Sequence, residues 1–344
     1  MTEPRKHLGA LAAGALLFVA PASALAEPPR ALTASLGESA EPDQPAPAIV
    51  TKHHARFLSD RDADQKLQDI GWALVTGNAP FCTAPILAAG LRLQDARAFG
   101  SPSEIRKILG RDTDFTVRTV AAGSPAFEAG IRPGMALLSI DGDALNAWPT
   151  DADRPWARYQ RAHDLIDQSL ASTGVVVLTF EGGVTHTLAG APSCSTRFEM
   201  ETRSDTALAD GKRVRLGRDF PAFDDARDEF AAIIAHELAH NLLRHRAWLD
   251  ANGRTRGKIR STEREADRLM PWLLANAGYD PEAALRFMKR WGPQTETGLF
   301  RARTHEHWKK RMQTIAAEIP LVREAMADGS VADWSSRFQR EISP

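Results

Sequence analysis

The sequence has little of three features that would point to particular classes of protein: net charge, cysteine and long apolar runs. Its 344 residues include 43 basic and 44 acidic side chains, for a formal net charge of -1. A chain this close to neutral is not typical of proteins that bind nucleic acid or anionic membranes, so we set those partners aside. Beyond residue 26, no apolar run is long enough to span a bilayer, and membrane contact is not required.

The beginning of the chain is different, because basic residues precede a short apolar run there. Residues 5–7 are Arg, Lys and His, residues 8–20 are apolar or small, and Ala24 and Ala26 form a small-x-small cleavage site. This order is typical of a secretory signal peptide over residues 1–26. We therefore predict an exported protein, in the periplasm or, as the alternative, secreted. An uncleaved amphiphilic anchor is the other interpretation of the same pattern.

The two cysteines, Cys82 and Cys194, take their meaning from this export signal. In an oxidising compartment two cysteines are more often paired than free, so we predict a disulfide bond between them. Closing a loop of this length stabilises a fold by about 4 to 5 kcal/mol in the chain-entropy model. Two unrelated buried thiols are the alternative. Neither cysteine stands in a C-x-x-C pair, so neither is proposed as a metal ligand.

The length of the chain predicts two folded units with tails, because one hydrophobic core seldom extends over so many residues. Residues 27–55 follow the signal and begin rich in proline and small residues, which predicts a disordered linker. From Arg56 to Thr76, apolar residues recur at helical intervals, which predicts a helix that ends near Gly77. We assign residues 56–84 to this helical segment and expect it to pack on the C-terminal domain.

The middle of the chain is rich in predicted strands. Residues 115–120 alternate between apolar and polar, residues 136–140 precede an Asp-Gly turn, and residues 175–180 form a continuous apolar run. A short helix is expected within residues 124–134, where a proline marks its start and a glycine its end. Residues 161–170 are a second helix candidate.

This order of elements, with the segment SPAFEAGIRPGMALLSIDGDAL at residues 124–145, resembles a bacterial PDZ domain of the type attached to periplasmic proteases. The resemblance covers residues 85–192, although Met135 stands where an aspartate is usual. It implies a β-rich domain that binds an extended or C-terminal peptide segment as an added strand at a sheet edge. A small β-domain that serves as a spacer is the alternative. Because Cys82 and Cys194 flank this domain, their disulfide is expected to connect its base to the rest of the molecule.

The segment that points to chemistry is H-E-L-A-H at residues 236–240, within a helix predicted over residues 224–249. His236 and His240 are four positions apart and lie on one helix face, the spacing with which two imidazoles can bind one metal ion. Glu237 follows the first histidine and is the candidate general base that activates water. Two solvent-facing histidines on an ordinary helix are the alternative, so the metal hypothesis needs a third ligand.

Two simple sources of that third ligand fail. His245 is nine positions after His236 and would lie on the far side of a continuous helix. The metzincin pattern is also broken, because Leu243 and Arg246 stand where it requires glycine and histidine.

A second predicted helix supplies better candidates. Its start is expected at residues 261–262, a serine and a threonine that could cap it. Glu263 and Asp267 share one face of this helix, whereas Glu265 points elsewhere. Glu263 as the third ligand, with Asp267 holding the second nitrogen of a ligand histidine, would complete a His, His, Glu zinc site.

Four segments in this order resemble the metallopeptidase family that includes HtpX, BepA and the CAAX-prenyl proteases. They are ALADGKRVRLGRDF at 207–220, AAIIAHELAHNLLRH at 231–245, STEREADRL at 261–269 and RTHEHWKKR at 303–311. The resemblance implies a gluzincin metallopeptidase domain over residues 193–325, mainly helical with a small edge-strand sheet. It implies one zinc ion per chain, bound by His236, His240 and Glu263.

The same resemblance gives roles to residues around the zinc ion. It implies that Glu237 is the general base and that Asp267 supports a ligand histidine. It also implies that the strand around residues 214–216 pairs with the substrate backbone. His305 and Arg311 are expected to approach the active site, where His305 would stabilise the oxyanion of the tetrahedral intermediate.

Together, these observations predict an α+β protein with a PDZ-like domain and a mainly helical peptidase domain. After the zinc segment, helices are expected over residues 263–277, 281–291 and 305–318, and residues 326–344 are assigned to a C-terminal tail.

The predicted function is that of a zinc-dependent metalloendopeptidase that hydrolyses peptide bonds of exported or misfolded proteins. The alternative is a peptide-binding or chaperone-like module whose zinc site is structural or gated. In that case a fourth protein ligand, such as His245 or His305, would close the coordination position that a catalytic site keeps open. Zinc hydrolysis of a non-peptide substrate is a third hypothesis, because ligands alone do not define the substrate.

Overall fold

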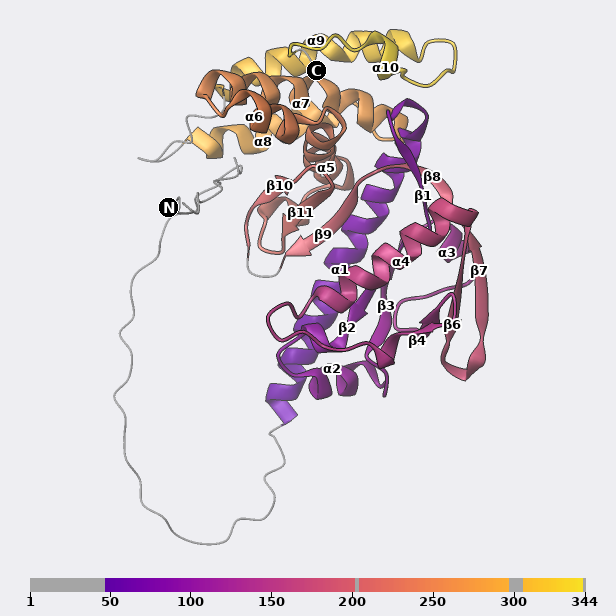
Figure 1. Cartoon of the computed structure of the whole chain (residues 1–344). Coiled ribbons are helices and arrows are strands. Elements are labelled where there is room, and N and C mark those ends of the chain that lie inside the picture. The colour runs from indigo at the N-terminus through magenta and orange to yellow at the C-terminus, as the bar shows by residue number, and fades with distance from the viewer. Residues whose placement is uncertain (1–46, 202–203, 297–305, 343–344) are drawn as a thin grey trace, which may run out of the picture. The chain divides into compact units, whose positions relative to one another are not determined.

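The structure is a computed structural model, and it describes residues 47–201, 204–296 and 306–342. The predicted signal peptide, the linker up to residue 46, and His305 lie outside the described residues. The described chain combines helices with several small sheets, which confirms the α+β class (Figure 1). No helix in this described part is both long and apolar enough to cross a membrane.

The chain divides into two compact units. We call the first the β-rich unit; its described part is residues 47–69 and 87–191. We call the second the helical unit; it comprises residues 70–86 and the described residues from Pro192 onward.

Helix α1 (Pro47–Gly77) supplies residues to both units. It ends at Gly77 as the sequence predicts, but it begins at Pro47, inside the segment predicted to be linker, rather than at Arg56. Proline is compatible with the first helical position, because the N–H group that it lacks has no partner inside the helix there. The C-terminal part of α1 packs closely in the helical unit, since a Cβ atom on Gly71 would lie 2.3 Å from the ring of Phe198.

The β-rich unit contains two antiparallel sheets. Strand β2 (Leu91–Asp95) pairs with β3 (Phe115–Val120), and four further strands follow the order β5-β4-β6-β7. These four are β4 (Leu137–Ile140), β5 (Asp143–Ala144), β6 (Val175–Phe180) and β7 (Thr185–Ala189). The helices of the unit are α2 (Pro102–Leu109), α3 (Pro125–Glu128) and α4 (Ala157–Thr173). Strands β3 and β6 have the bounds that the sequence predicts, whereas α4 is longer than predicted at both ends.

Apolar side chains from both sheets and from α4 form the core of this unit. Its largest fully buried members include Phe115, Phe180, Leu137, Ile140 and Leu145. Strand β6 contributes alternate residues to this core, namely Val176, Leu178 and Phe180.

Polar contacts at the middle of α1 hold this helix on the β-rich unit. Asp64 is only 2% exposed and accepts hydrogen bonds from Arg92 Nη1 at 3.0 Å and Arg118 Nε at 2.7 Å. The Gln65 amide donates to the Val120 carbonyl at 2.7 Å and accepts from the Val120 N–H at 3.1 Å. This side chain therefore occupies both backbone groups of Val120, as a neighbouring strand would.

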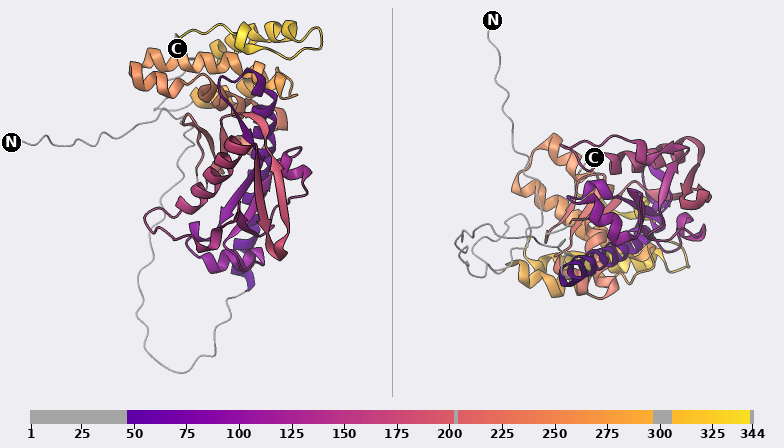
Figure 2. Two further views of the ribbon diagram at one scale, coloured as in Figure 1. Left: turned by 45° about the vertical axis from the view of Figure 1, so that its right-hand side comes forward. Right: turned by 90° about the horizontal axis from the view of Figure 1, so that it is seen from below.

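The helical unit packs its helices on one three-stranded sheet. The strands are β9 (Arg197–Glu201), β10 (Ala207–Ala209) and β11 (Arg213–Gly217), in the order β10-β11-β9. The helices are α5 (Arg227–Leu242), α6 (His245–Asn252), α7 (Arg256–Asn276), α8 (Ala283–Trp291), α9 (Trp308–Ala325) and α10 (Trp334–Arg337). Figure 2 shows the yellow C-terminal helices lying along the orange α7, which α9 contacts.

The helix predicted over residues 224–249 is interrupted. Helix α5 ends at Leu242, Arg244 has a φ of 58°, and α6 begins at His245. A left-handed residue changes the direction of the chain, so residues after it do not continue the face pattern of α5. The prediction that His245 lies on the far side of a continuous helix is therefore wrong.

The helix that carries Glu263 begins earlier than predicted. Helix α7 starts at Arg256, with the Thr255 side chain accepting a hydrogen bond from the Lys258 N–H at 3.4 Å. Thr262, predicted as a possible cap, lies inside the helix and donates to the Ile259 carbonyl instead. A threonine can make either bond, so the residue type alone did not distinguish a cap from an interior position.

The segment predicted to be a C-terminal tail packs on the helical unit. Trp334 is buried and donates to Asn78 Oδ1 at 2.9 Å, and the Asn276 amide donates to the Ala332 carbonyl at 3.0 Å. Phe338 and Ile342 are buried as well. The last described residues therefore belong to the core of this unit.

The predicted disulfide bond between Cys82 and Cys194 is present, with the two Cα atoms 5.6 Å apart. Both cysteines belong to the helical unit. Cys194 ends β8 (Ala191–Cys194), which pairs with β1 (Pro85–Ala88), and the chain passes between the two units within these strands. The bond thus joins the segments that lead into and out of the β-rich unit, and it fits an oxidising compartment outside the cytosol.

Candidate metal centre

Helices α5 and α7 bring two histidines and a glutamate together. His236 and His240 are one turn apart on α5, and their Nε2 atoms are 3.3 Å apart. Glu263 on α7 lies opposite, with Oε2 3.4 Å from His236 Nε2 and Oε1 3.5 Å from His240 Nε2. Among the described residues, these three side chains are close enough together to hold a metal ion. We call them the triad.

The distances within this group fit a tetrahedral metal site. Zinc binds histidine nitrogen and carboxylate oxygen at about 2.0 to 2.1 Å, so ligand atoms at tetrahedral angles lie about 3.3 to 3.4 Å apart. The two histidine nitrogens are 3.3 Å apart, and each lies 3.4 to 3.5 Å from one of the two Glu263 oxygens, which is close to this spacing. Three protein ligands leave one coordination position for water or substrate, which is the arrangement of catalytic rather than structural zinc sites.

The charges around the triad favour a cation. Burial lowers the pKa of His236, but Asp267 and Glu263 outweigh it and raise this pKa to about 10. For His240, burial lowers the pKa well below its usual value, so this ring is neutral and can offer a nitrogen lone pair. A positive charge beside His236, whether a proton or a metal ion, is thus stabilised by two carboxylates.

Asp267 supports His236 from behind, and Arg311 holds Asp267 in place. Asp267 Oδ1 lies 3.2 Å from His236 Nδ1, the ring nitrogen that faces away from Glu263. Arg311 on α9 donates to both oxygens of Asp267 at 2.7 Å. Burial raises the pKa of Asp267, but Arg311 and His236 together outweigh burial and hold this pKa at about 2. Arg311 therefore reaches the site through Asp267.

His240 is supported by a different set of residues, which sequence reasoning missed. His245 Nδ1 lies 3.0 Å from His240 Nδ1, and His245 Nε2 lies 3.0 Å from Glu265 Oε2. Because His245 contacts the side of His240 that faces away from the triad, it does not take the fourth coordination position. The gating role considered for His245 is therefore not supported. The sequence gives no signal for the break at Arg244, because the residues around it continue a helical pattern.

Glu265, which was expected to point elsewhere than Glu263 and Asp267, binds His245 and the C-terminal segment. Burial raises its pKa, but His245, Arg340 and the Ile342 N–H outweigh burial and hold this pKa at about 2. For His245, burial dominates and lowers the pKa, so the ring is neutral beside an ionised Glu265.

Glu237 lies between the triad and the edge of the sheet. It is 4% exposed and accepts a hydrogen bond from the Ala209 N–H on β10. Burial is the main cause that raises its pKa to about 7. A carboxyl group with this pKa can both accept and donate a proton near neutral pH, as a general acid–base catalyst requires.

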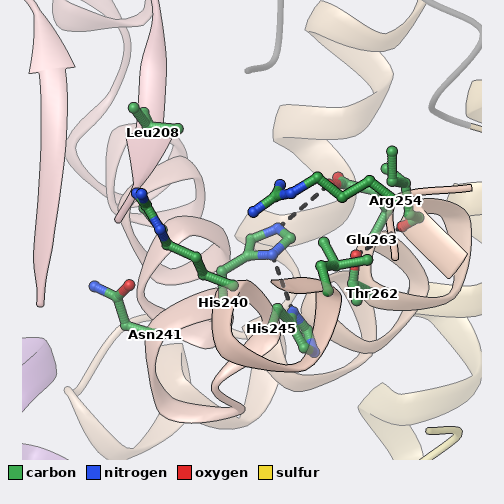
Figure 3. Close-up of a pocket in the computed structure, with 11 residues that line it drawn as sticks. Leu208, His240, Asn241, His245, Arg254, Thr262 and Glu263 are labelled. Carbon is green, nitrogen blue, oxygen red and sulfur yellow. Dashed lines mark hydrogen bonds and ion pairs between the residues drawn. The ribbon is translucent and has the colours of Figure 1, made fainter. Parts of the chain in front are cut away.

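A pocket opens beside His240 and Glu263 (Figure 3). Its volume is about 50 Å³, and Leu208 and Ala209 of β10 form one wall. The lining also includes two apolar side chains, two arginines and three other polar residues, namely Leu249, Ile259, Arg246, Arg254, Asn241, His245 and Thr262.

The strand beside this pocket is not the one that the family resemblance implied. Residues 214–216 lie in β11, which is paired with β10 on one side and β9 on the other. A strand with two partners cannot accept a third, so substrate pairing by these residues is excluded. β10, at the end of the strand order, is the strand next to the triad.

In the β-rich unit, the edge of β2 that does not face β3 is turned toward α4. The Leu93 N–H donates to His163 Nε2 of α4 at 3.3 Å, and Arg92 Nη2 donates to the Tyr159 hydroxyl at 2.8 Å. Among the described strands only β3 pairs with β2. This edge is the candidate place for an added peptide strand, and α4 already occupies part of it.

Comparisons with protein-family models, with curated proteins and with solved structures gave no match to this chain. The functional assignment therefore depends on the geometry of the site.

Proposed function

We propose that this protein is a metal-dependent endopeptidase, with zinc as the metal ion held by His236, His240 and Glu263. The observation that carries the proposal is the three-ligand group with a buried carboxyl group, Glu237, next in sequence to its first histidine. Bound there, a zinc ion would polarise the scissile carbonyl and lower the pKa of water.

Glu237 performs the proton transfers in this proposal. It accepts a proton from the attacking water and passes it to the nitrogen of the leaving amine. The pKa of about 7 that burial gives it suits both steps, because the group exchanges its proton readily near neutral pH. Asp267 keeps the His236 ring oriented while charge develops at the site.

The substrate is proposed to be an extended polypeptide lying along β10. Leu208 and Ala209 place this strand against the pocket beside the triad, and an extended peptide can pair with the backbone of an edge strand. The apolar lining from Leu249 and Ile259 would accept a small apolar side chain of the substrate. Exported or misfolded proteins present such extended, apolar segments, and we propose them as substrates in the periplasm.

The β-rich unit is proposed to be a PDZ-like module that collects peptide segments at the edge of β2 that faces α4. The supporting observation is that this edge faces α4 and has no second strand among the described residues. The family resemblance suggests the same role, and the disulfide fits a protein that works outside the cytosol.

Replacing Glu237 by glutamine tests the proposed mechanism. Glu237→Gln should retain one zinc ion per chain, measured by elemental analysis, and lose cleavage of casein by about a hundredfold or more because the proton acceptor is gone. Glu229→Gln, on the first turn of the same helix, is the matched control and should keep wild-type activity.

The outcomes separate the two main hypotheses. Full activity in Glu237→Gln would remove the proposed mechanism. A wild-type protein that binds zinc but cleaves nothing, and that suppresses aggregation of an unfolded protein, would instead support the peptide-binding or chaperone-like alternative. Absence of zinc from the purified protein would contradict the metal assignment itself.

A further inference from the structure

A chain of buried contacts connects the C-terminal segment to the metal ligand His240. It begins at residues 340–342 and passes through Glu265 and His245. We propose that this chain fixes the proton of His240 on Nδ1 and thereby leaves Nε2 free to bind the metal ion. The inference rests on the proposed metal site.

The first step concerns Glu265, which is fully buried. Arg340 Nε donates to its two oxygens at 3.1 and 3.0 Å, and the backbone N–H groups of Glu341 and Ile342 donate to Oε1. A guanidinium and a backbone N–H can only donate, so in all of these bonds Glu265 is the acceptor. The C-terminal segment therefore presents an ionised carboxylate to His245.

The second step concerns the ring of His245, which is 1% exposed. Its Nε2 lies 3.0 Å from Glu265 Oε2, and a carboxylate can only accept, so this nitrogen carries the proton. In a neutral imidazole the other nitrogen is then an acceptor. His245 Nδ1 thus offers its lone pair to His240 Nδ1, 3.0 Å away.

The third step places the proton on the ligand. His240 Nδ1 must be the donor to His245, which leaves the lone pair of His240 Nε2 directed at Glu263 and His236. This is the tautomer that can bind a metal ion through Nε2. Without Glu265, nothing in the contact between two neutral histidines would decide which ring donates.

The C-terminal segment also holds the backbone that makes this contact possible. Arg340 Nη2 donates to the Leu243 carbonyl at 3.2 Å, at the break between α5 and α6. This bond stabilises the turn that brings His245 back toward His240. Arg340 thus stabilises the turn between α5 and α6 and also holds the Glu265 carboxylate in its orientation.

The geometry therefore assigns His245, Glu265 and Arg340 as positioning residues for the metal site. Outer partners of metal-binding histidines typically change metal affinity by 10- to 100-fold. We expect His245→Phe to weaken zinc binding by about 10- to 100-fold, because His240 Nδ1 loses its acceptor. Arg340→Ala should weaken it in the same direction, and Arg340→Lys should restore part of the loss.

The experiment measures two quantities on folded protein. Histidine nitrogen NMR of the metal-free protein reports which ring nitrogens carry protons; we expect Nδ1–H for His240 and Nε2–H for His245. Competition with a chelator then gives zinc affinity for each variant. Glu341→Ala is the matched control, since its side chain binds Arg264 while its backbone N–H to Glu265 is retained.

A His240 ring protonated on Nε2 in the wild type would overturn the proposal, whatever the peptidase activity. So would zinc affinities of His245→Phe and Arg340→Ala equal to that of Glu341→Ala. Should His245→Phe not fold, the comparison of Arg340→Ala with Arg340→Lys decides alone. Failure of the wild type to cleave casein would count against the proposed function and leave the tautomer measurement intact.

Discussion

His236 and His240 lie one turn apart on the same helix, yet their ring nitrogens are held by different parts of the chain. Asp267 and Arg311 support His236, whereas His245 and Glu265 support His240. Behind each histidine lies a buried carboxylate: Asp267 contacts His236 directly, and Glu265 contacts His240 through His245. An arginine donates hydrogen bonds to each of these carboxylates. Buried carboxylates need such partners, because an unpaired charge away from water costs several kcal/mol.

A first prediction concerns the buried pair Asp267 and Arg311. Asp267→Asn should reduce the free energy of unfolding by about 3 to 5 kcal/mol, because Arg311 keeps its charge in a buried place without a counter-charge. It should also weaken zinc binding by about 10- to 100-fold. Urea unfolding in the presence of a chelator and zinc competition measure the two effects.

The double variant Asp267→Asn, Arg311→Met separates these effects. Removing both charges should recover most of the stability, since an apolar side chain can replace a buried ion pair at little cost. Zinc binding should remain weak, because the carboxylate beside His236 is still missing. Recovery of both quantities would show that Asp267 affects the metal site only through folding.

At the residue scale, the sequence identified the candidate metal-binding group His236, His240 and Glu263 because the spacing of these residues carries the information. Residues four apart share a helix face, so His236 with His240, and Glu263 with Asp267, could be placed from the helical period alone. The role of His245 could not be found this way. It depends on a single left-handed residue, Arg244, and arginine gives no signal for that conformation.

At the scale of elements, the break between α5 and α6 decides which side chains meet. Arg244 adopts a φ of 58°, a region that costs a residue with a side chain about 1 kcal/mol relative to glycine. The Arg244 side chain is exposed and therefore does not hold the backbone in this conformation. Contacts made by neighbouring residues must do so. The bond from Arg340 to the Leu243 carbonyl is one such restraint.

A second prediction follows for this position. Arg244→Gly should raise the free energy of unfolding by up to about 1 kcal/mol, because glycine adopts positive φ without a steric penalty. Ala247→Gly, at an exposed position inside α6, is the matched control and should lower it by about 1 kcal/mol. Urea denaturation of both variants measures the difference. A destabilised Arg244→Gly would contradict the assigned conformation.

Strand and helix bounds were predictable to different degrees, for physical reasons. Strands β3 and β6 matched their predicted bounds because they alternate or run apolar into a buried core. The start of α7 was missed, since its first residues, Arg256 and Gly257, are exposed and give no apolar period before the packed part of the helix begins. The start of α1 was missed because residues 47–55 directly follow the proline-rich segment that predicted a linker.

A third prediction concerns the edge of β2, where a peptide strand would add. The Leu93 N–H is already bonded to His163, so a peptide must displace that ring before it can pair there. His163→Ala should tighten binding of an extended peptide by about 2- to 10-fold, the worth of one hydrogen bond that no longer has to be broken. Fluorescence anisotropy with a labelled peptide provides the measurement.

Ser169→Ala is a suitable control for that experiment, because Ser169 lies on the same helix and bonds Asp141 and the Leu165 carbonyl instead. It should leave peptide affinity unchanged. Weaker binding in His163→Ala than in this control would indicate that His163 contacts the peptide rather than competing with it.

At the scale of the whole molecule, the sequence predicted two units, the disulfide and the packing of residues 56–84 on the C-terminal domain, but not the packing of the last residues. Residues 87–191 form most of the β-rich unit, and the helical unit combines segments from both sides of it. The described C-terminal residues, predicted as a tail, pack on the helical unit, where Trp334 donates to Asn78 and Arg340 donates to Glu265. Such pairing of distant segments depends on tertiary packing, which local periodicity does not encode.

The last prediction concerns the disulfide bond, which encloses the β-rich part of the chain from Cys82 to Cys194, a separation of 112 residues. In the chain-entropy model, a loop of this length restricts the unfolded chain by about 4 to 5 kcal/mol. Cys82→Ser, Cys194→Ser should therefore lose up to about that much free energy of unfolding, measured by urea denaturation. Reductant should lower the wild-type midpoint to that of the double variant and leave the double variant unchanged. Equal midpoints for oxidised wild type and double variant would mean that the bond does not restrain the unfolded chain.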